Sequence, residues 1–247
     1  MSVFTIADLH LSTASDHGMD VFGSRWRDYT QKIVKNWRAV VTDNDTVIIP
    51  GDISWAMTLA DTKNDFALLE SLPGKKLLGK GNHDFWWDTA TKCNKYFAQN
   101  QFTSFSLLYN NAYVVEDFIV CGTRGWFLEK NQQITVGEVD YEKIMNRELQ
   151  RLRFSLQAAK SLQAAENAQK EILCFLHFPP LWGDFISEEM IDTMLSFGVK
   201  RCYFGHIHGA YTAPQHQIHN GLSLYLISSD HLDFVPHKIF PLENGSS

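Results

Sequence analysis

The sequence predicts an α/β or α+β domain of four layers, in which two mixed β-sheets form a sandwich and helices cover its outer faces. Strand-like and helix-like segments alternate in the first part of the chain, and strand-like segments dominate later. This order is typical of two packed sheets with helices outside. No repeat, low-complexity tract or Gly/Ser linker precedes the tail at residues 243–247. We therefore predict a single domain over residues 1–247.

The predicted strands are short runs of apolar and β-branched residues. TVIIP at Thr46–Pro50 and ILCFL at Ile172–Leu176 have the composition of buried strands. Phe105–Gly122 predicts a hairpin that turns at Asn110-Asn111, followed by a further turn at Glu116-Asp117. The other predicted strands are Val3–Ala7, Lys76–Leu78, Arg201–Phe204, Ser223–Ser228 and Lys238–Phe240.

The predicted helices carry apolar residues at helical spacing. In Trp26–Val41, the residues Ile33, Trp37 and Val40 fall on one stripe. Val139–Lys170 repeats apolar residues every three to five positions, which predicts a long helix. The remaining predicted helices are Leu59–Leu72, ended by Pro73-Gly74, then Trp87–Gln99, and Ser187–Phe197 with Ser187 as its N-cap.

The composition is that of a globular protein with an acidic surplus. Hydrophobic residues make up 45% and charged residues 20% of the 247 positions, and the formal net charge is −6. This balance argues against a protein that coats nucleic acid, because such affinity comes mostly from Lys and Arg on phosphates. The sequence has no basic and apolar leader and no apolar run long enough to span a bilayer. We expect a cytoplasmic location, no membrane partner and no nucleic-acid partner.

The four cysteines do not predict a metal or redox motif. They are Cys93, Cys121, Cys174 and Cys202, and no pair has CxxC spacing. The last three lie in apolar runs, so we interpret them as small buried hydrophobic residues.

Five short segments carry almost all the candidate metal ligands, and each follows an apolar strand. They are Asp8-Leu9-His10, Gly51-Asp52, Gly81-Asn82-His83-Asp84, His177, and Gly205-His206-Ile207-His208-Gly209. In sheets flanked by helices, ligands bind at the carboxyl ends of strands, so the five segments should converge on one edge. Carboxylate and imidazole groups together suit Zn, Mn or Fe.

The spacing within two segments adds to this prediction. Residues two apart in an extended segment point to the same side. Asp8 and His10 are therefore expected to face one ion, and His206 and His208 to face a shared site. Taken singly, each segment has an ordinary interpretation as a strand end, a turn or a core histidine. The joint occurrence of all five, in this order, favours a metal centre.

The order D-x-H, GD, GNH, H, GHxH resembles the calcineurin-like metallophosphoesterase superfamily from Asp8 to His208. More narrowly, GDISWAM, LPGKK leading into GNHDFWW, and GTRGW resemble a group of bacterial predicted phosphohydrolases. The resemblance implies the metallophosphoesterase fold, a β-sandwich flanked by helices. It also implies two divalent or trivalent metal ions, namely Mn, Zn or Fe.

The resemblance further implies a role for each motif residue. The metal ligands would be Asp8, His10 and His208 for the first ion, Asn82, His177 and His206 for the second, and Asp52 for both. His83 would contact the substrate and act as the general acid that protonates the leaving group, and Asp84 would orient it. A hydroxide bridging the two metals would be the nucleophile.

The predicted function is metal-dependent hydrolysis of a phosphodiester or a small phosphomonoester, with a small phosphorylated substrate as partner. The phosphoprotein phosphatases carry GDxVDRG and RGNHE, whereas this chain has GDISWAM and KGNHD, which argues against phosphoprotein substrates. Arg124 in GTRGW is a candidate clamp for a phosphate oxygen and equally a candidate for a surface salt bridge. The tryptophans near the motifs are candidates for stacking on an aromatic leaving group or for core packing; they are Trp55, Trp86, Trp87 and Trp126.

Two alternatives stay open. A nuclease or cyclic-nucleotide phosphodiesterase built on the same site would be expected to show a basic patch, which this acidic sequence does not indicate. A metal-binding interaction scaffold without strong catalysis would be expected to lack the histidine at position 83, and His83 is present. The sequence makes no prediction of oligomeric state.

Overall fold

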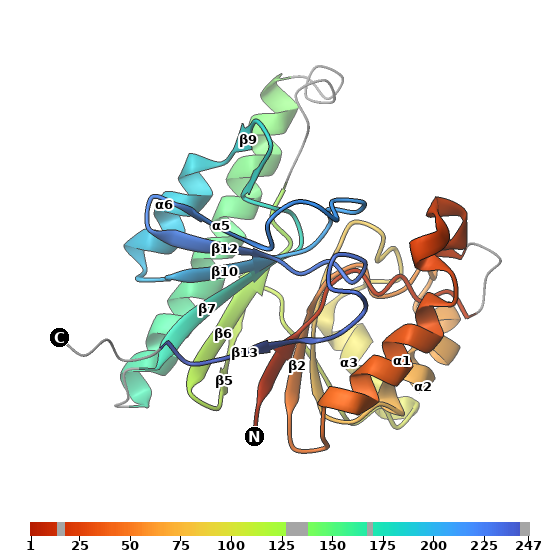
Figure 1. Cartoon of the computed structure of the whole chain (residues 1–247). Coiled ribbons are helices and arrows are strands. Elements are labelled where there is room, and N and C mark those ends of the chain that lie inside the picture. Colours follow the sequence, from red (N-terminus) through yellow and green to blue (C-terminus); the bar gives the residue numbers. More distant parts are fainter. Residues whose placement is uncertain (14–17, 127–137, 167–169, 243–247) are drawn as a thin grey trace.

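The computed structural model describes residues 1–13, 18–126, 138–166 and 170–242. Two large β-sheets are packed together, with helices α1, α2 and α3 on one outer side and α5 and α6 on the other (Figure 1). This confirms the predicted four-layer arrangement of two mixed sheets flanked by helices.

The first sheet has the strand order β13-β1-β2-β3-β4. Its strands are β13 (His237–Ile239), β1 (Val3–Thr5), β2 (Thr46–Pro50), β3 (Lys75–Gly79) and β4 (Phe105–Leu107). The strands from β1 to β4 are parallel, and β13 is antiparallel to β1. The parallel strands place their carboxyl ends along the same edge.

The second sheet has the strand order β11-β12-β10-β7-β6-β5. Its strands are β11 (His216–His219), β12 (Leu222–Leu226), β10 (Arg201–Phe204), β7 (Glu171–Leu176), β6 (Phe118–Thr123) and β5 (Ala112–Val115). The four central strands are parallel, and both edge strands are antiparallel. A separate two-stranded ribbon pairs β8 (Leu181–Trp182) with β9 (Phe185–Ile186).

The helices bury one face each against a sheet. They are α1 (Tyr29–Val40), α2 (Lys63–Glu70), α3 (Ala90–Gln99), α5 (Glu138–Ala165) and α6 (Glu188–Ser196). Trp37 and Phe66 belong to the core between the first sheet and its helices, and Leu156 belongs to the core under α5. The third core, between the two sheets, contains Ile48 and Leu173. Within the described ranges, none of the helices combines the length and apolar character needed to cross a bilayer.

The predicted hairpin at Asn110-Asn111 is wrong, because the chain crosses there from one sheet to the other. Leu107 of β4 pairs with β3, whereas Ala112 of β5 pairs with β6. The Asn111 side chain holds this crossing: its Oδ1 accepts from the Tyr109 N–H at 2.8 Å and its Nδ2 donates to Leu107 O at 2.9 Å. The predicted turn at Glu116-Asp117 is confirmed by the antiparallel pairing of β5 with β6.

Most other differences concern the ends of elements. α1 begins later than predicted, after Asp28, whose φ is 55°. α3 begins after Thr89, whose side chain accepts from the Lys92 N–H at 3.4 Å. Ser187 precedes α6 as predicted, but its side chain makes no capping hydrogen bond. The edge strand β11 and the β8–β9 ribbon were not predicted, since short edge strands leave little apolar pattern.

Candidate metal centre

The five motif segments meet at the carboxyl ends of β1, β2, β3, β7 and β10, as the sequence predicts. Backbone hydrogen bonds fasten the loops to each other: the Asp8 N–H donates to Gly51 O at 3.1 Å, and the Gly205 N–H donates to His177 O at 3.1 Å. The His206 N–H donates to Asp8 Oδ2 at 2.8 Å, which joins the loop of the first sheet to that of the second. The site therefore lies between the two sheets.

The first group of candidate ligands contains Asp8, His10 and His208, each of which offers an atom within 4.8 Å of the others. His10 Nε2 lies 3.1 Å from His208 Nε2. Asp8 and His10 do lie on one side, as expected, but extended backbone is not the reason. Both residues have left-handed backbone, with φ of 60° and 46°, and this bend turns both side chains toward His208.

The second group contains Asp52, His177 and His206, again with one ligand atom each within 4.8 Å. Asn82 belongs beside it, because its Oδ1 lies 2.7 Å from His177 Nε2. His206 and His208 lie at one site, but in its two different candidate groups. β10 has already ended at Phe204 and His206 has a φ of 71°, so the two histidines belong to different groups.

Asp52 lies between the two groups. Its Oδ2 is 3.7 Å from His10 Nε2 of the first group and 3.4 Å from His177 Nε2 of the second. Its Oδ1 is held by the N–H of His83 at 2.8 Å. Asp8 Oδ1 also approaches the second group, at 3.7 Å from His177 Nδ1. All seven predicted ligands thus come together, and their binding of metal stays a prediction.

Two glycines make this close approach possible. A Cβ at Gly205 would lie 2.5 Å from Asp8 Oδ2, and a Cβ at Gly81 would overlap the Asp52 carboxylate. Since any side chain at these positions would displace a carboxylate, Gly81 and Gly205 are fixed by the shape of the site.

The electrostatics of the two groups suit a cation. Burial raises the pKa of Asp8 to about 6 and, together with Asp84 and Asp8, raises that of Asp52 well above its usual range. Burial also lowers the pKa values of His10 and His177. Metal binding needs ionised carboxylates and neutral imidazoles. Burial therefore favours the neutral form of His10 and His177, and a cation would favour the ionised form of the carboxylates.

Unpaired buried atoms point the same way. Asp8 Oδ1 and His177 Nδ1 lie 3.7 Å apart, are buried and have no hydrogen-bond partner in the described part of the chain. Buried polar atoms are costly unless something satisfies them. Carboxylate oxygens and imidazole nitrogens are the donors that Zn, Mn and Fe accept. The residues present therefore fit bound metal ions.

Asp84 does not orient His83, which corrects the role that the resemblance implied. Its carboxylate accepts hydrogen bonds from the N–H groups of Asp52, Ile53, Ser54 and Gly81 at 2.8–3.3 Å and from Trp86 Nε1 at 2.9 Å. These donors use both carboxylate oxygens. Asp84 thus ties the two loops that carry Asp52 and Asn82 together.

His83 lies at the rim of the first group. Its ring centroid is 5.6 Å from that of His10 and 4.3 Å from that of Trp55, and its Nδ1 has no hydrogen-bond partner in the described ranges. Burial and the neighbouring His208 lower the pKa of His83. This half-buried imidazole is placed to contact a molecule bound over the two groups.

The other candidate residues differ in their relation to the site. Trp55 stacks on His10 with ring centroids 5.0 Å apart, whereas Trp86 is buried in the core. Trp87 packs on Tyr109, and Trp126 packs on Phe178. Arg124 forms a partly buried ion pair, with its Nη2 3.7 Å from Glu148 Oε1, and its role as a phosphate clamp stays a prediction.

Asp230 was missed by the sequence analysis. It is fully buried, its Oδ1 lies 2.9 Å from His208 Nδ1, and its Oδ2 accepts from the Gly209 N–H at 2.9 Å. The signal was present, because Asp230 follows the apolar run of β12 just as the other segments follow their strands. A carboxylate on the far nitrogen of a ligating histidine fixes its tautomer and ring orientation.

The chain is similar in sequence to one known family and in fold to a solved structure. The sequence model described as calcineurin-like phosphoesterase matches residues 1–210. TT1561 of Thermus thermophilus has a similar fold, with a TM-score of 0.55 at 10% identity over 93% of this chain and 89% of that one. A protein of unknown function from Aquifex aeolicus aligns with a TM-score of 0.47 at 14% identity, over 96% of this chain and 95% of that one. No curated protein matches the sequence.

Proposed function

Since the chain belongs to the calcineurin-like phosphoesterase family, we propose that it hydrolyses phosphodiesters or small phosphomonoesters at a centre of two metal ions. The observation that carries this proposal is the position of Asp52, whose Oδ2 faces His10 in one candidate group and His177 in the other. A single carboxylate oxygen between two ligand sets is suited to bridge two cations.

The proposed ligands divide as the geometry groups them. The first ion would be held by Asp8, His10 and His208, the second by Asn82, His177 and His206, and Asp52 would contact both. Bound metal ions would supply an activated water at neutral pH and positive charge for the phosphoryl oxygens. The mixed oxygen and nitrogen donors favour Mn, Zn or Fe over Ca.

His83 is the proposed general acid. Its imidazole lies beside the first group, where it can reach the oxygen that leaves the phosphorus. Burial and His208 hold its pKa below the ordinary value, so the protonated form needs the negative charge of a bound phosphoester beside it. Trp55 limits the rotation of this ring by packing on it. A positioned proton donor of this kind typically contributes about 10²–10⁴-fold to the rate.

A panel of esters tests the proposal. The chain would be loaded separately with Mn, Zn, Fe and Mg, its metal content measured by elemental analysis, and each form assayed with a bis-aryl phosphate, an aryl phosphate and a phosphopeptide. We expect two metal ions per chain and a clear preference for the aryl esters. A preference for the phosphopeptide contradicts the proposed substrate class. Binding of metals without hydrolysis of any ester favours the interaction scaffold instead.

A further inference from the structure

Two arginines share one buried acid beside the metal centre. Arg124 Nη2 lies 3.7 Å from Glu148 Oε1, and Arg151 Nη1 donates to the same oxygen. Glu148 is only 1% exposed, whereas the side chains of Arg124 and Arg151 are 21% and 31% exposed. The two guanidinium groups and the carboxylate therefore have one net positive charge. Part of each guanidinium side chain is open to solvent.

Lys80 adds a third positive charge at this place. Leu78 of β3 pairs in parallel register with Leu107 of β4, and the Leu108 N–H donates to Leu78 O at 2.8 Å. Two residues beyond this pair, the same register places Lys80 opposite Tyr109. The guanidinium of Arg151 lies 5.7 Å above the ring of that same tyrosine. We call Lys80, Arg124 and Arg151 the basic cluster.

The basic cluster has unused hydrogen-bonding capacity. Within the described ranges, Lys80 forms no side-chain hydrogen bond and no ion pair, and Arg124 Nε is buried without a partner. Three positively charged side chains and one carboxylate leave a net positive charge. A bound anion would offset the repulsion among these cations.

The basic cluster is joined directly to the metal centre. The carbonyl of Arg124 accepts from the N–H groups of His177 and Phe178 at 3.1 and 2.9 Å. The Phe178 ring lies between the two features: its centroid is 4.5 Å from that of His206 and 5.8 Å from the guanidinium carbon of Arg124. Lys80 immediately precedes the Gly81-Asn82 segment of the site. A small molecule bound at the metals can thus extend toward the cluster.

An aromatic cavity of about 310 Å³ has Tyr109 in its wall. Its walls include Trp87, Tyr109 and Tyr113, and the ring centroids of the first two are 5.6 Å apart. Asn94 and Ser106 also line it, and within the described ranges their side chains make no hydrogen bond. Flat aromatic walls with free amide and hydroxyl groups suit a planar heterocycle, because stacking and edge hydrogen bonds are both available.

We infer that the basic cluster and the adjoining aromatic cavity form a subsite for the second phosphoryl group and the base of a small nucleotide substrate. The inference rests on the proposed function, since the first phosphoryl group would be the ester held at the metal centre. Tyr109 links the two halves of the subsite, because Arg151 covers its ring and the cavity includes it. The substrate class is therefore a nucleotide with two separate phosphoryl groups.

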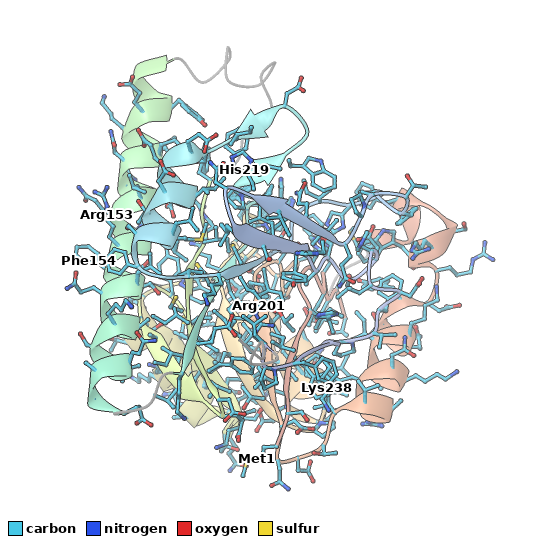
Figure 2. All side chains as sticks on the ribbon, turned by 60° about the vertical axis from the view of Figure 1, so that its left-hand side comes forward. Met1, Arg153, Phe154, Arg201, His219 and Lys238 are labelled. Atoms are coloured by element: carbon cyan, nitrogen blue, oxygen red, sulfur yellow. The ribbon has the colours of Figure 1, made fainter. Side chains whose placement is uncertain are left out.

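The test compares three esters and three variants of the metal-loaded chain. The esters are a nucleoside bisphosphate with one phosphoryl group on each of two ribose hydroxyls, a sugar bisphosphate without a base, and a simple aryl phosphate. The variants are Lys80→Gln, Arg151→Gln and, as a matched control, Arg153→Gln. Arg153 lies on the same helix but points away from the body of the protein (Figure 2). Lys80→Gln is decisive if Arg151→Gln unfolds, because the Lys80 side chain has no hydrogen-bond or ion-pair partner among the described residues to lose.

We expect Lys80→Gln and Arg151→Gln to raise KM for both bisphosphates about 10-fold or more, as loss of a charged hydrogen bond does. The KM for the aryl phosphate should change less than about 2-fold, and Arg153→Gln should change none of the three. Trp87→Leu should raise KM for the nucleoside bisphosphate alone, by about 10-fold. Equal effects on all three esters, or no effect, would overturn the inference.

A binding measurement separates this inference from the proposed function. Calorimetry would give the Kd of the nucleoside bisphosphate for the metal-free wild type and for Lys80→Gln. If the metal-loaded chain hydrolyses none of the esters, the proposed function fails, yet a Kd weakened about 10-fold by Lys80→Gln still supports the subsite. An unchanged Kd overturns the subsite even where hydrolysis is observed.

Discussion

His208 Nδ1 lies 2.9 Å from Asp230 Oδ1, and the other oxygen of Asp230 holds the Gly209 N–H at 2.9 Å. One buried carboxylate thus fixes both the ring and the backbone of the GHIHG segment, and leaves His208 Nε2 directed toward His10. Burial lowers the pKa of His208, but the hydrogen bond to Asp230 and the charge of Asp8 outweigh it, so the pKa lies above its ordinary value. This relationship makes Asp230 a positioning residue for the first metal site.

Asp230→Asn should weaken metal binding at the first site about 10- to 100-fold, as loss of such an outer partner typically does. The amide keeps an acceptor for His208 but sets its NH₂ group against the Gly209 N–H. Titration of the metal-free protein with Mn²⁺, followed by calorimetry, measures the affinity. Asp233→Asn is the control, since Asp233 lies nearby in sequence and its side chain is 77% exposed. Equal affinities in both variants would show that Asp230 does not position His208.

Asp52→Asn should be the most damaging change among the proposed ligands. Asp52 is the residue placed to contribute negative charge to both ions, so the variant should lose metal and reduce turnover by more than about 100-fold, the upper range for an outer partner. Elemental analysis and the aryl ester assay measure the two effects. Asp117→Asn, in the exposed turn between β5 and β6, serves as the control. Retention of both metals with near-normal turnover would refute the bridging role.

His83→Ala should discriminate between leaving groups. An alkyl ester departs as a strongly basic alkoxide that needs a proton, whereas a nitrophenolate departs readily without one. The variant should lose roughly 10²–10⁴-fold on alkyl esters and clearly less on nitrophenyl esters, with unchanged metal content. His216→Ala, exposed on β11, is the control. Equal losses on both esters would mean that His83 stabilises phosphoryl charge instead of donating a proton.

Asp84→Asn should destabilise the chain. The substituted amide would set two N–H bonds against some of the five donors that surround the carboxylate. We expect the free energy of unfolding to fall by about 2–5 kcal/mol, the range for breaking a buried charged network. Urea denaturation of the metal-free protein measures it. Asp88→Asn is the control: this exposed carboxylate pairs with Lys92 and the Thr89 N–H, so its loss should lower the urea midpoint far less than Asp84→Asn does.

Metal affinity should depend on pH through Asp8. Burial raises the pKa of this carboxyl to about 6 in the metal-free chain, so below that pH a bound metal must displace a proton. The apparent affinity should fall about 10-fold per pH unit below pH 6 and should not change further through Asp8 above it. Calorimetry in two buffers of different ionisation enthalpy would detect the released proton. An affinity independent of pH over this range would contradict the raised pKa.

The location of the site was predictable because its residues follow apolar strands, and the structure keeps that order. The local geometry was not, since it depends on left-handed backbone at Asp8, His10 and His206 that no spacing rule indicates. The role of Asp84 was mistaken because it was carried over from the family resemblance, whereas its carboxylate is occupied by backbone N–H groups and Trp86. Asp230 was overlooked because a single acid after a strand is ordinary until its partner is known.

The fold was predictable where periodicity is strong and less so where pairing is distant. β2 was predicted with its observed bounds because a run of buried β-branched residues leaves few alternatives. The crossing at Asn110-Asn111 resembled a hairpin because two apolar strands separated by asparagines have the same local pattern in both cases. Only the pairing of β4 with β3 distinguishes them, and that pairing is set by residues far away in sequence.

The pairing of β1 with β13 bears on how the chain acquires its shape during synthesis. Val3 pairs with Ile239, so that edge of β1 stays uncovered until the much later strand β13 has been synthesised. Asp230 also emerges after every proposed ligand. The residues of the second candidate group are all synthesised once His206 has emerged. The first group lacks the carboxylate that holds His208 until Asp230 has emerged. A nascent chain arrested between these two points should therefore capture one ion firmly and the other weakly.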